Sequence, residues 1–191
     1  MNTPQASPAS SPTAASSSPQ ELVIDGAGSD TGNKFLTFTL GPEEYGFEIL
    51  NVREIIGVVD ITPLPQSPDY VRGVINLRGR IIPVMELRTR FGLDTIPYDE
   101  ETCIIVLEVS DEENDEAFQM GVVVDTVNEV LDIPTGSIDP TPRFGSTLDT
   151  NFIFGLGKAR DRVVTLLEVE AVLAGEIQDL TGESDEFADA A

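Results

Sequence analysis

Apolar and polar residues alternate with a period of two through much of the chain between residues 34 and 174. Such alternation is typical of β-strands that place one face in a core. KFLTFTL (34–40) shows it clearly, and a turn at 41–46 leads to a strand at 45–49. The segment 50–56 fits either a short helix or a continuing strand. Further strands are predicted at 57–65, 71–77, 80–87, 102–109, 117–124, 151–157 and 162–169.

Short helices and tight connections complete this prediction. A short helix at 87–92 ends at Gly92, and a terminal helix at 169–175 ends at a glycine. The strands at 102–109 and 117–124 form a hairpin around the acidic run DEENDE. The last two strands form another hairpin.

An internal repeat relates the two halves of this region. YGFEILNVREII (45–56) aligns with MGVVVDTVNEVL (120–131), which places Gly46 on Gly121. Farther along, RIIPVMEL aligns with RVVTLLEV, and the changed offset indicates loops of different length. We therefore predict a mainly β fold with short helices, made of two pseudo-symmetric five-stranded barrels. A groove between them is a natural place for a binding site.

The two ends of the chain differ from this region in composition. Residues 1–33 are rich in Ser, Pro and Ala, and they have too little apolar content to offset the entropy of ordering. We predict a disordered segment at 1–33, a folded domain at 34–174 and an acidic flexible tail at 175–191.

The chain is strongly acidic, with 34 Asp and Glu against 11 Lys and Arg and a net charge of −23. Such a surface repels nucleic acids and anionic lipids. Lysine occurs only at Lys34 and Lys158, although arginine is retained. The charge fits either an ordinary self-repelling protein or one adapted to molar salt, and the lysine scarcity favours the second.

Neither a membrane span nor an export signal is predicted. The chain has no apolar run of the ~18 residues that a transmembrane helix needs. No Lys or Arg precedes Lys34, whereas a signal peptide carries positive charge there. The single cysteine, Cys103, allows no intramolecular disulfide, which fits a reducing compartment. A cytoplasmic protein is expected.

No pattern of catalytic or cofactor-binding residues is present. The chain has no histidine, no phosphate-binding loop and no dinucleotide fingerprint. Cys103 lies in an apolar strand, which indicates a buried small residue rather than a nucleophile. The acidic hairpin from Asp111 to Glu116 lacks the glycine and closing glutamate of a calcium loop. We predict no enzyme, no cofactor and no metal.

The stretch VRGVINLRGRIIPVMELRTRF (71–91) holds five of the 11 basic residues. Its alternation sends Gly73 and Ile75 to one face, and the run from Asn76 through Gly79 turns the chain. Gly79 supplies the backbone freedom of a tight turn. Arg78 projects there, and two interpretations are open. Its planar fork binds a partner's carboxylate or carbonyl groups, or it offsets the local negative field.

The order and the sequences of these segments resemble those of the CheW family, the coupling proteins of bacterial and archaeal chemotaxis. FLTFTLGPEEYGFEILNVREII, then VRGVINLRGRIIPVMEL, then RVVTLLEVEAVL carry the similarity, which covers about 34–174. The resemblance implies two SH3-like barrels and an adaptor without catalysis. It also implies that one surface binds the cytoplasmic tip of chemoreceptors and another binds the regulatory domain of the histidine kinase CheA.

The receptor-contact positions of the family fall on matching residue types in this sequence. The predicted receptor-binding set is Val52, Glu54, Gly73, Asn76 and Arg78. On this interpretation the arginine cluster forms a local positive patch for a partly acidic helical partner. The resemblance assigns no kinase-binding residue.

Three alternatives remain open from the sequence. One is a coupling protein of the same family in a pilus-type pathway. Another is an SH3-like barrel that binds a small ligand in the groove between the barrels. The third is an enzyme with an unrecognised carboxylate site.

Overall fold

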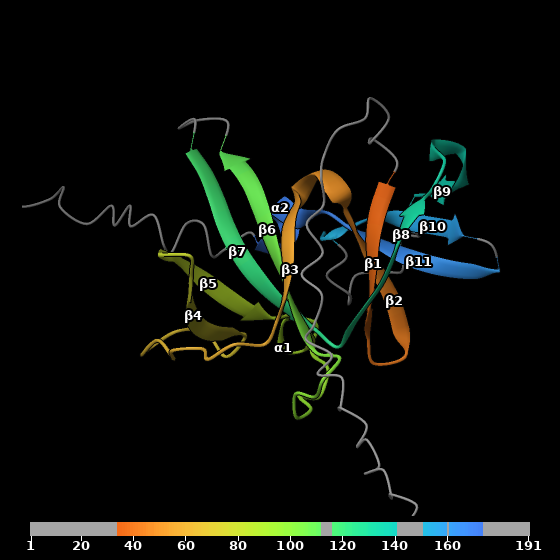
Figure 1. Cartoon of the computed structure of the whole chain (residues 1–191). Coiled ribbons are helices and arrows are strands. Elements are labelled where there is room, and N and C mark those ends of the chain that lie inside the picture. Colours follow the sequence, from red (N-terminus) through yellow and green to blue (C-terminus); the bar gives the residue numbers. More distant parts are fainter. Residues whose placement is uncertain (1–33, 112–115, 141–150, 160, 174–191) are drawn as a thin grey trace, which may run out of the picture.

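The computed structural model describes residues 34–111, 116–140, 151–159 and 161–173. The predicted disordered segment and the predicted acidic tail lie outside these residues. Most of the described residues belong to two β-sheets, joined by short helical turns (Figure 1).

The first sheet has six strands in the order β8-β1-β2-β11-β10-β9. Its strands are β1 (Lys34–Leu40), β2 (Glu43–Glu48), β8 (Thr126–Asp132), β9 (Ile138–Asp139), β10 (Ile153–Ala159) and β11 (Arg162–Leu167). The second sheet has five strands in the order β3-β6-β7-β5-β4. Its strands are β3 (Val52–Gly57), β4 (Val71–Leu77), β5 (Arg80–Glu86), β6 (Cys103–Asp111) and β7 (Glu116–Val124).

The described residues contain four helical turns. They are η1 (Ile49–Asn51), α1 (Leu87–Arg90), η2 (Thr135–Ser137) and α2 (Val169–Leu173). Three of them lie between strands, and the fourth, α2, follows the last strand. The prediction of a mainly β fold with short helices in two barrel-like units is confirmed, but the first sheet has six strands where five were predicted, because the two-residue strand β9 adds to its edge.

Each sheet combines strands from both halves of the chain. After β2, the chain passes through η1 into β3 and so leaves the first sheet for the second. After β7 it makes the reverse crossing and enters β8. The first half therefore contributes two strands to one sheet and three to the other, so the sequence repeat does not coincide with the sheets.

Both sheets curl toward closure. The chain leaves edge strand β3 and returns to the opposite edge, where Thr62 pairs with Val74 of β4. In the other sheet the chain leaves edge strand β8 and pairs with β10 through β9. An edge strand followed by pairing at the far edge is the closure that small barrels use to remove exposed edges.

The repeat that was read from the sequence is present in three dimensions. Gly46 lies opposite Leu166 in the parallel pair β2–β11, and Gly121 lies opposite Val84 in the parallel pair β5–β7. At both glycines an added Cβ would come within 3.4 Å of a neighbouring apolar side chain. The alignment of Gly46 with Gly121 therefore marks equivalent places where two strands and their core lie close.

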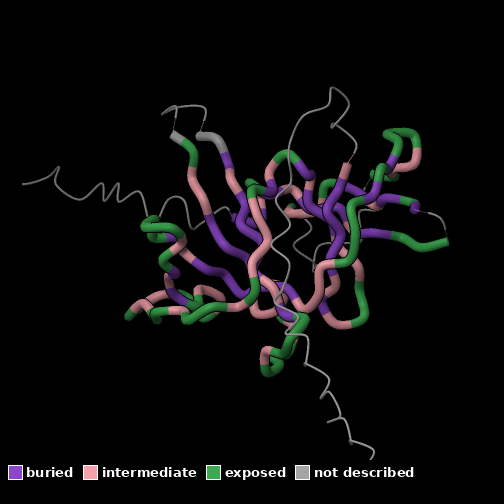
Figure 2. The backbone as a smooth tube through the Cα atoms, viewed as in Figure 1, coloured by how far each residue is buried: buried purple, intermediate pink, exposed green. Residues whose placement is uncertain are grey.

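Apolar side chains form one core inside each sheet and a larger one between the sheets. The core of the first sheet contains Phe35, Leu131 and Val164, and that of the second contains Ile75, Ile82 and Ile104. The largest cluster draws on both sheets and on α2. Figure 2 shows that buried segments run along the strands and exposed ones lie mainly at the turns. The space between the sheets is therefore filled by side chains.

Several predicted boundaries need correction. Residues 50–56 are neither a helix nor one strand, because η1 ends at Asn51 and β3 begins at Val52. A strand over 57–65 was wrong: β3 ends at Gly57, and beyond it only the bridge at Thr62 remains. Prolines at 63 and 65 cannot donate to a ladder, which accounts for the loss. Strand β8 was indicated only by its alignment with 45–56.

In the described part of the chain, no helix is both long enough and apolar enough to span a membrane.

Candidate functional site

The β4–β5 hairpin ends in the two-residue turn Arg78–Gly79, flanked by the pair Leu77 and Arg80. Both turn residues have positive φ, +52° and +88°. A type I′ hairpin turn requires this and normally places Asn, Asp or Gly there. The N–H of Gly79 donates a hydrogen bond of 2.9 Å to Oδ1 of Asn76. An arginine in the left-handed region costs about 1–2 kcal/mol, so its presence points to a role outside folding.

Arg78 faces Glu54, which lies on the opposite edge strand of the same sheet. Arg78 Nη2 lies 3.0 Å from Glu54 Oε2, and Nη1 donates to Oε1 at 3.4 Å. Because the sheet curls, β3 and the β4–β5 turn meet at this ion pair. The Arg78 side chain is 65% exposed and that of Glu54 is 17% exposed. A partner can therefore reach the guanidinium, which the carboxylate already orients.

The other predicted receptor-binding residues occupy different kinds of position. Asn76 is exposed on β4 and belongs to the same turn as Arg78. Val52 is 6% exposed and packs in the core between the sheets. Gly73 is buried at a register shift, with φ +138°, and an added Cβ would lie 2.0 Å from the Thr62 carbonyl oxygen. Glu54 and Arg78 thus share one surface with Asn76 of the same turn, whereas Val52 and Gly73 are buried in β3 and β4.

The arginines of the 71–91 stretch do not form one exposed positive patch. Arg72 lies near Glu86, and Arg90 lies over the ring of Tyr70 at 4.8 Å. Arg88 is the clearest departure, because its side chain is only 11% exposed. The prediction of a single cluster presented to a partner is wrong for Arg88, since sequence adjacency does not show which way each side chain points.

Arg88 binds Asp125 through two hydrogen bonds of 2.6 Å. Asp125 stands between β7 and β8, where the chain crosses from one sheet to the other. Its Oδ2 also accepts from the N–H of Gly41, at 2.8 Å, in the β1–β2 turn. Burial raises the pKa of Asp125, but the bonds from Arg88 and Gly41 outweigh burial and hold that pKa below its usual value. The group therefore stays charged and ties the two sheets together.

A second buried carboxylate lies at the end of β5. Glu86 is 3% exposed, and its Oε2 accepts a hydrogen bond of 2.6 Å from the hydroxyl of Tyr98. Burial raises the pKa of Glu86, and Tyr98 and Arg72 offset only part of that effect. Burial and the bond to Glu86 raise the pKa of Tyr98 to about 12. The pair pins the 92–102 connection to the sheet.

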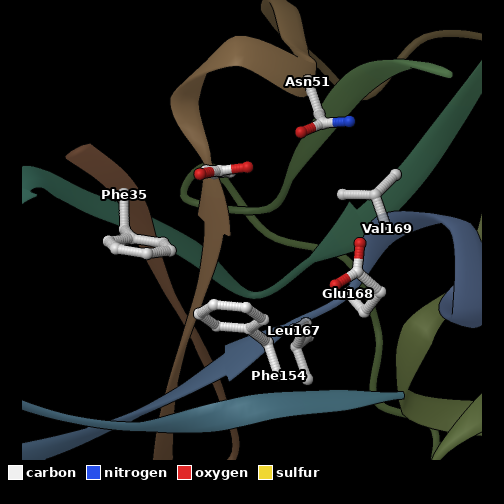
Figure 3. Close-up of a pocket in the computed structure, with 7 residues that line it drawn as sticks. Phe35, Asn51, Phe154, Leu167, Glu168 and Val169 are labelled. Carbon is white, nitrogen blue, oxygen red and sulfur yellow. The ribbon is translucent and has the colours of Figure 1, made fainter. Parts of the chain in front are cut away.

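A shallow pocket opens where the first sheet meets α2 (Figure 3). Its empty volume, open mouth included, is about 270 Å³. The lining residues are Phe35, Glu48, Asn51, Phe154, Leu167, Glu168 and Val169. Leu167 and Val169 also belong to the core between the sheets, so the pocket lies at the margin of that core. Sequence reasoning missed this site, because its residues come from distant segments with no shared motif.

The described residues contain no group of three or more His, Cys, Asp or Glu side chains arranged to hold a metal ion. The calcium-loop candidate falls mostly on residues 112–115, which lie outside the described residues. Burial raises the pKa of the Cys103 thiol, which keeps it protonated and unreactive near neutral pH.

Comparison with known proteins gives a consistent result. The CheW-like domain family matches residues 34–176. The chain is 41% identical to Chemotaxis protein CheW of Klebsiella aerogenes over 150 residues, covering 78% of this chain and 87% of that protein. It is 32% identical to Chemotaxis protein CheW of Bacillus subtilis over 144 residues, covering 75% and 88%. The crystal structure of the scaffolding protein TtCheW from Thermoanaerobacter tengcongensis aligns with a TM-score of 0.65 and 34% identity, covering 74% and 88%.

Proposed function

The chain belongs to the CheW family, and we propose that it is a non-catalytic adaptor that couples chemoreceptors to the histidine kinase CheA in chemotaxis. The family match spans both sheets, from the first residue of β1 to beyond α2. The described residues hold no metal cluster, and their one cysteine is a protonated thiol. Catalysis in such an assembly belongs to the kinase.

The Arg78–Glu54 pair is the observation that carries the receptor half of this proposal. It joins the two edges of a curled sheet and exposes a guanidinium that is already oriented. An Arg fork can bind a carboxylate or carbonyl groups of a helical partner in a bidentate manner. We place the cytoplasmic tip of a chemoreceptor on the surface formed by Glu54, Asn76 and Arg78, with Val52 and Gly73 buried in the strands β3 and β4 that carry or lead to it.

The mechanism of an adaptor is positional. It changes kinase activity only if receptor conformations differ in their interaction energy with the bound adaptor. The Arg88–Asp125 contact supports this mechanism, because it fixes one sheet against the other and lets the molecule transmit position as one body. We further propose that CheA binds through its regulatory domain, and that the adaptor works in the cytoplasm at membrane-associated receptor arrays.

The test is a reconstitution with a chemoreceptor tip fragment and CheA from the same organism. The adaptor should bind each partner in titration and should change CheA autophosphorylation only when the receptor is present. The adaptor alone should not hydrolyse ATP. Binding of neither partner, or ATP turnover that stays with the protein through stringent washing, would contradict the proposal.

A further inference from the structure

Two aromatic rings and two carboxylates line the pocket at the margin of the inter-sheet core. Phe35 and Phe154 provide the rings, and Glu48 and Glu168 provide the carboxylates. Figure 3 shows Phe35 and Phe154 bordering the same hollow, with Asn51 and Glu168 on its other sides. Phe154 is 53% exposed, which is unusual for a large apolar residue. The pocket thus offers ring faces and negative charge together.

The carboxylates of this pocket have no positive partner among the described residues. No described Lys or Arg forms an ion pair with Glu48 or Glu168. Burial raises the pKa of Glu168, and the neighbouring carboxylates of Glu170 and Glu48 raise it further. A cation placed here would relieve this repulsion.

We propose that this pocket receives an arginine or lysine side chain of the protein partner that binds beside β3. The methylene stem would lie against Phe35 and Phe154, and the charged end would lie between Glu48 and Glu168. Long basic side chains bury their stems on apolar surface while their charged ends stay polar. Ring faces and carboxylates both attract such a cation. This inference rests on the proposed adaptor function.

The position of the pocket favours a protein partner over a free small molecule. Asn51, in its lining, directly precedes Val52, where β3 begins. A partner seated on β3 can therefore reach the pocket with one side chain. The shallow open form gives a small amine little buried surface, whereas a side chain needs only to cover Phe154. The terminal segments of this chain, 1–33 and 174–191, contain no Lys or Arg that could fill the pocket instead.

The first experiment uses N-acetyl-arginine-methylamide as the probe and follows amide NMR signals of the full chain. The matched control probe is the citrulline analogue, which has nearly the same shape but no charge. Measurements in about 1 M NaCl shorten the Debye length to ~3 Å and suppress general attraction to the acidic surface. We expect saturable shifts at Asn51 and Gly155 with the arginine probe alone. Equal shifts with citrulline, or shifts spread over the whole surface, would overturn the proposal.

Variants then separate the pocket from the overall charge. Glu48→Gln with Glu168→Gln should abolish the shifts, and Glu43→Gln with Glu100→Gln, a pair of exposed carboxylates elsewhere, should leave them intact. Phe154→Ala should weaken the shifts without unfolding the protein, because Phe154 is exposed. Stronger probe binding in Arg143→Ala would show that the chain's own arginine fills the pocket. Signals at the pocket that change with protein concentration would assign it to a second copy. Either result would overturn the proposal.

The second experiment titrates the receptor tip fragment against the same variants. Loss of the two pocket carboxylates should weaken binding by about three- to ten-fold, the range expected for two partly exposed ion pairs. Unchanged affinity would overturn the pocket proposal and leave the adaptor function standing. A tip fragment that fails to bind the wild-type chain would contradict the adaptor function instead, and the arginine probe would still decide the pocket.

Discussion

Arg78, which we propose as a receptor contact, occupies a backbone conformation that costs stability. Its backbone lies in the left-handed region, and its side chain is 65% exposed. Arg78→Ala should weaken receptor-tip binding by tens-fold, as removal of an interface arginine that costs ~2 kcal/mol or more does. Stability should change by less than about 1 kcal/mol, because an exposed ion pair contributes little. Isothermal titration and thermal melting measure the two effects.

The matched control for Arg78 is Lys158→Ala. Lys158 and Asp139 form an exposed ion pair on the first sheet, away from Arg78. Removal of Lys158 therefore also breaks a surface ion pair. It should leave receptor binding unchanged. Arg78→Lys should recover only part of the affinity, since an ammonium lacks the planar fork. Equal loss of receptor and kinase binding in Arg78→Ala would mean that the residue maintains the turn and makes no specific contact.

Arg88, in contrast to Arg78, should matter to stability. It is nearly buried and holds Asp125 with two short hydrogen bonds. Arg88→Ala leaves that partly buried carboxylate without its cation, so we expect a loss of about 2–4 kcal/mol in the free energy of unfolding. Urea denaturation measures it. A loss below about 0.5 kcal/mol would show that the contact does not hold the sheets together.

Glu86 and Asp125 should give stability opposite dependences on pH. The pKa of Glu86 is raised in the folded protein, so its contribution is fully present below the unfolded pKa and is lost as pH rises through the folded pKa. Gln mimics the neutral acid and can still accept from Tyr98. Glu86→Gln should therefore gain stability relative to wild type as pH rises from about 4 to 7. A constant difference in urea denaturation across this range would contradict the expectation.

The contribution of Asp125 to the free energy of unfolding should change with pH in the opposite direction to that of Glu86. Its pKa is lowered in the folded protein, so its contribution is present above the unfolded pKa and is lost as pH falls through the folded pKa. Asp125→Asn should therefore cost most at neutral pH. The gap to wild type should narrow as pH falls below about 4.

At the scale of an element, the β4–β5 hairpin depends on two glycines for different reasons. A Cβ at Gly73 would lie 2.0 Å from the Thr62 carbonyl oxygen, whereas a Cβ at Gly79 would meet nothing within 4 Å. Gly73→Ala should break the Thr62–Val74 bridge and lower stability by more than about 2 kcal/mol. Gly79→Ala should cost only about 1 kcal/mol, from its positive φ. Thermal melting measures both effects. Similar melting temperatures for the two variants would contradict this difference.

The pattern along the chain predicted elements better than their partners. Alternation located β1, β4, β5, β6 and β7 because each buries one face, and period two records that directly. Alternation says nothing about which strand lies beside which. The crossing at η1 therefore went unseen, as did the parallel pairs β2–β11 and β5–β7. The Arg78–Glu54 contact was also hidden, since it depends on sheet curvature. A resemblance named both residues, but only the fold brings them together.

At the scale of the whole molecule, the net negative charge makes the folded protein repel itself. With a net charge of −23, the folded chain repels itself, and salt screens that repulsion as the Debye length falls from ~10 Å at 0.1 M to ~3 Å at 1 M. We propose that the protein is adapted to molar salt. Its melting temperature should rise steeply with NaCl over this range. A flat profile would remove the halophilic interpretation and leave the adaptor function untouched.

The exchange of strands between the sheets has a consequence for biosynthesis. When translation has passed α1, β1 and β2 still lack β8 and β11, and β3 to β5 still lack β6 and β7. About 80 residues remain before α2 is complete, which at ~5–20 residues per second takes roughly 4–16 s. During that time the nascent chain carries unpaired strand edges, which are prone to pair with other chains. The second sheet can be completed once β7 has emerged, but the first sheet cannot be completed until the last β-hairpin, β10–β11, has emerged.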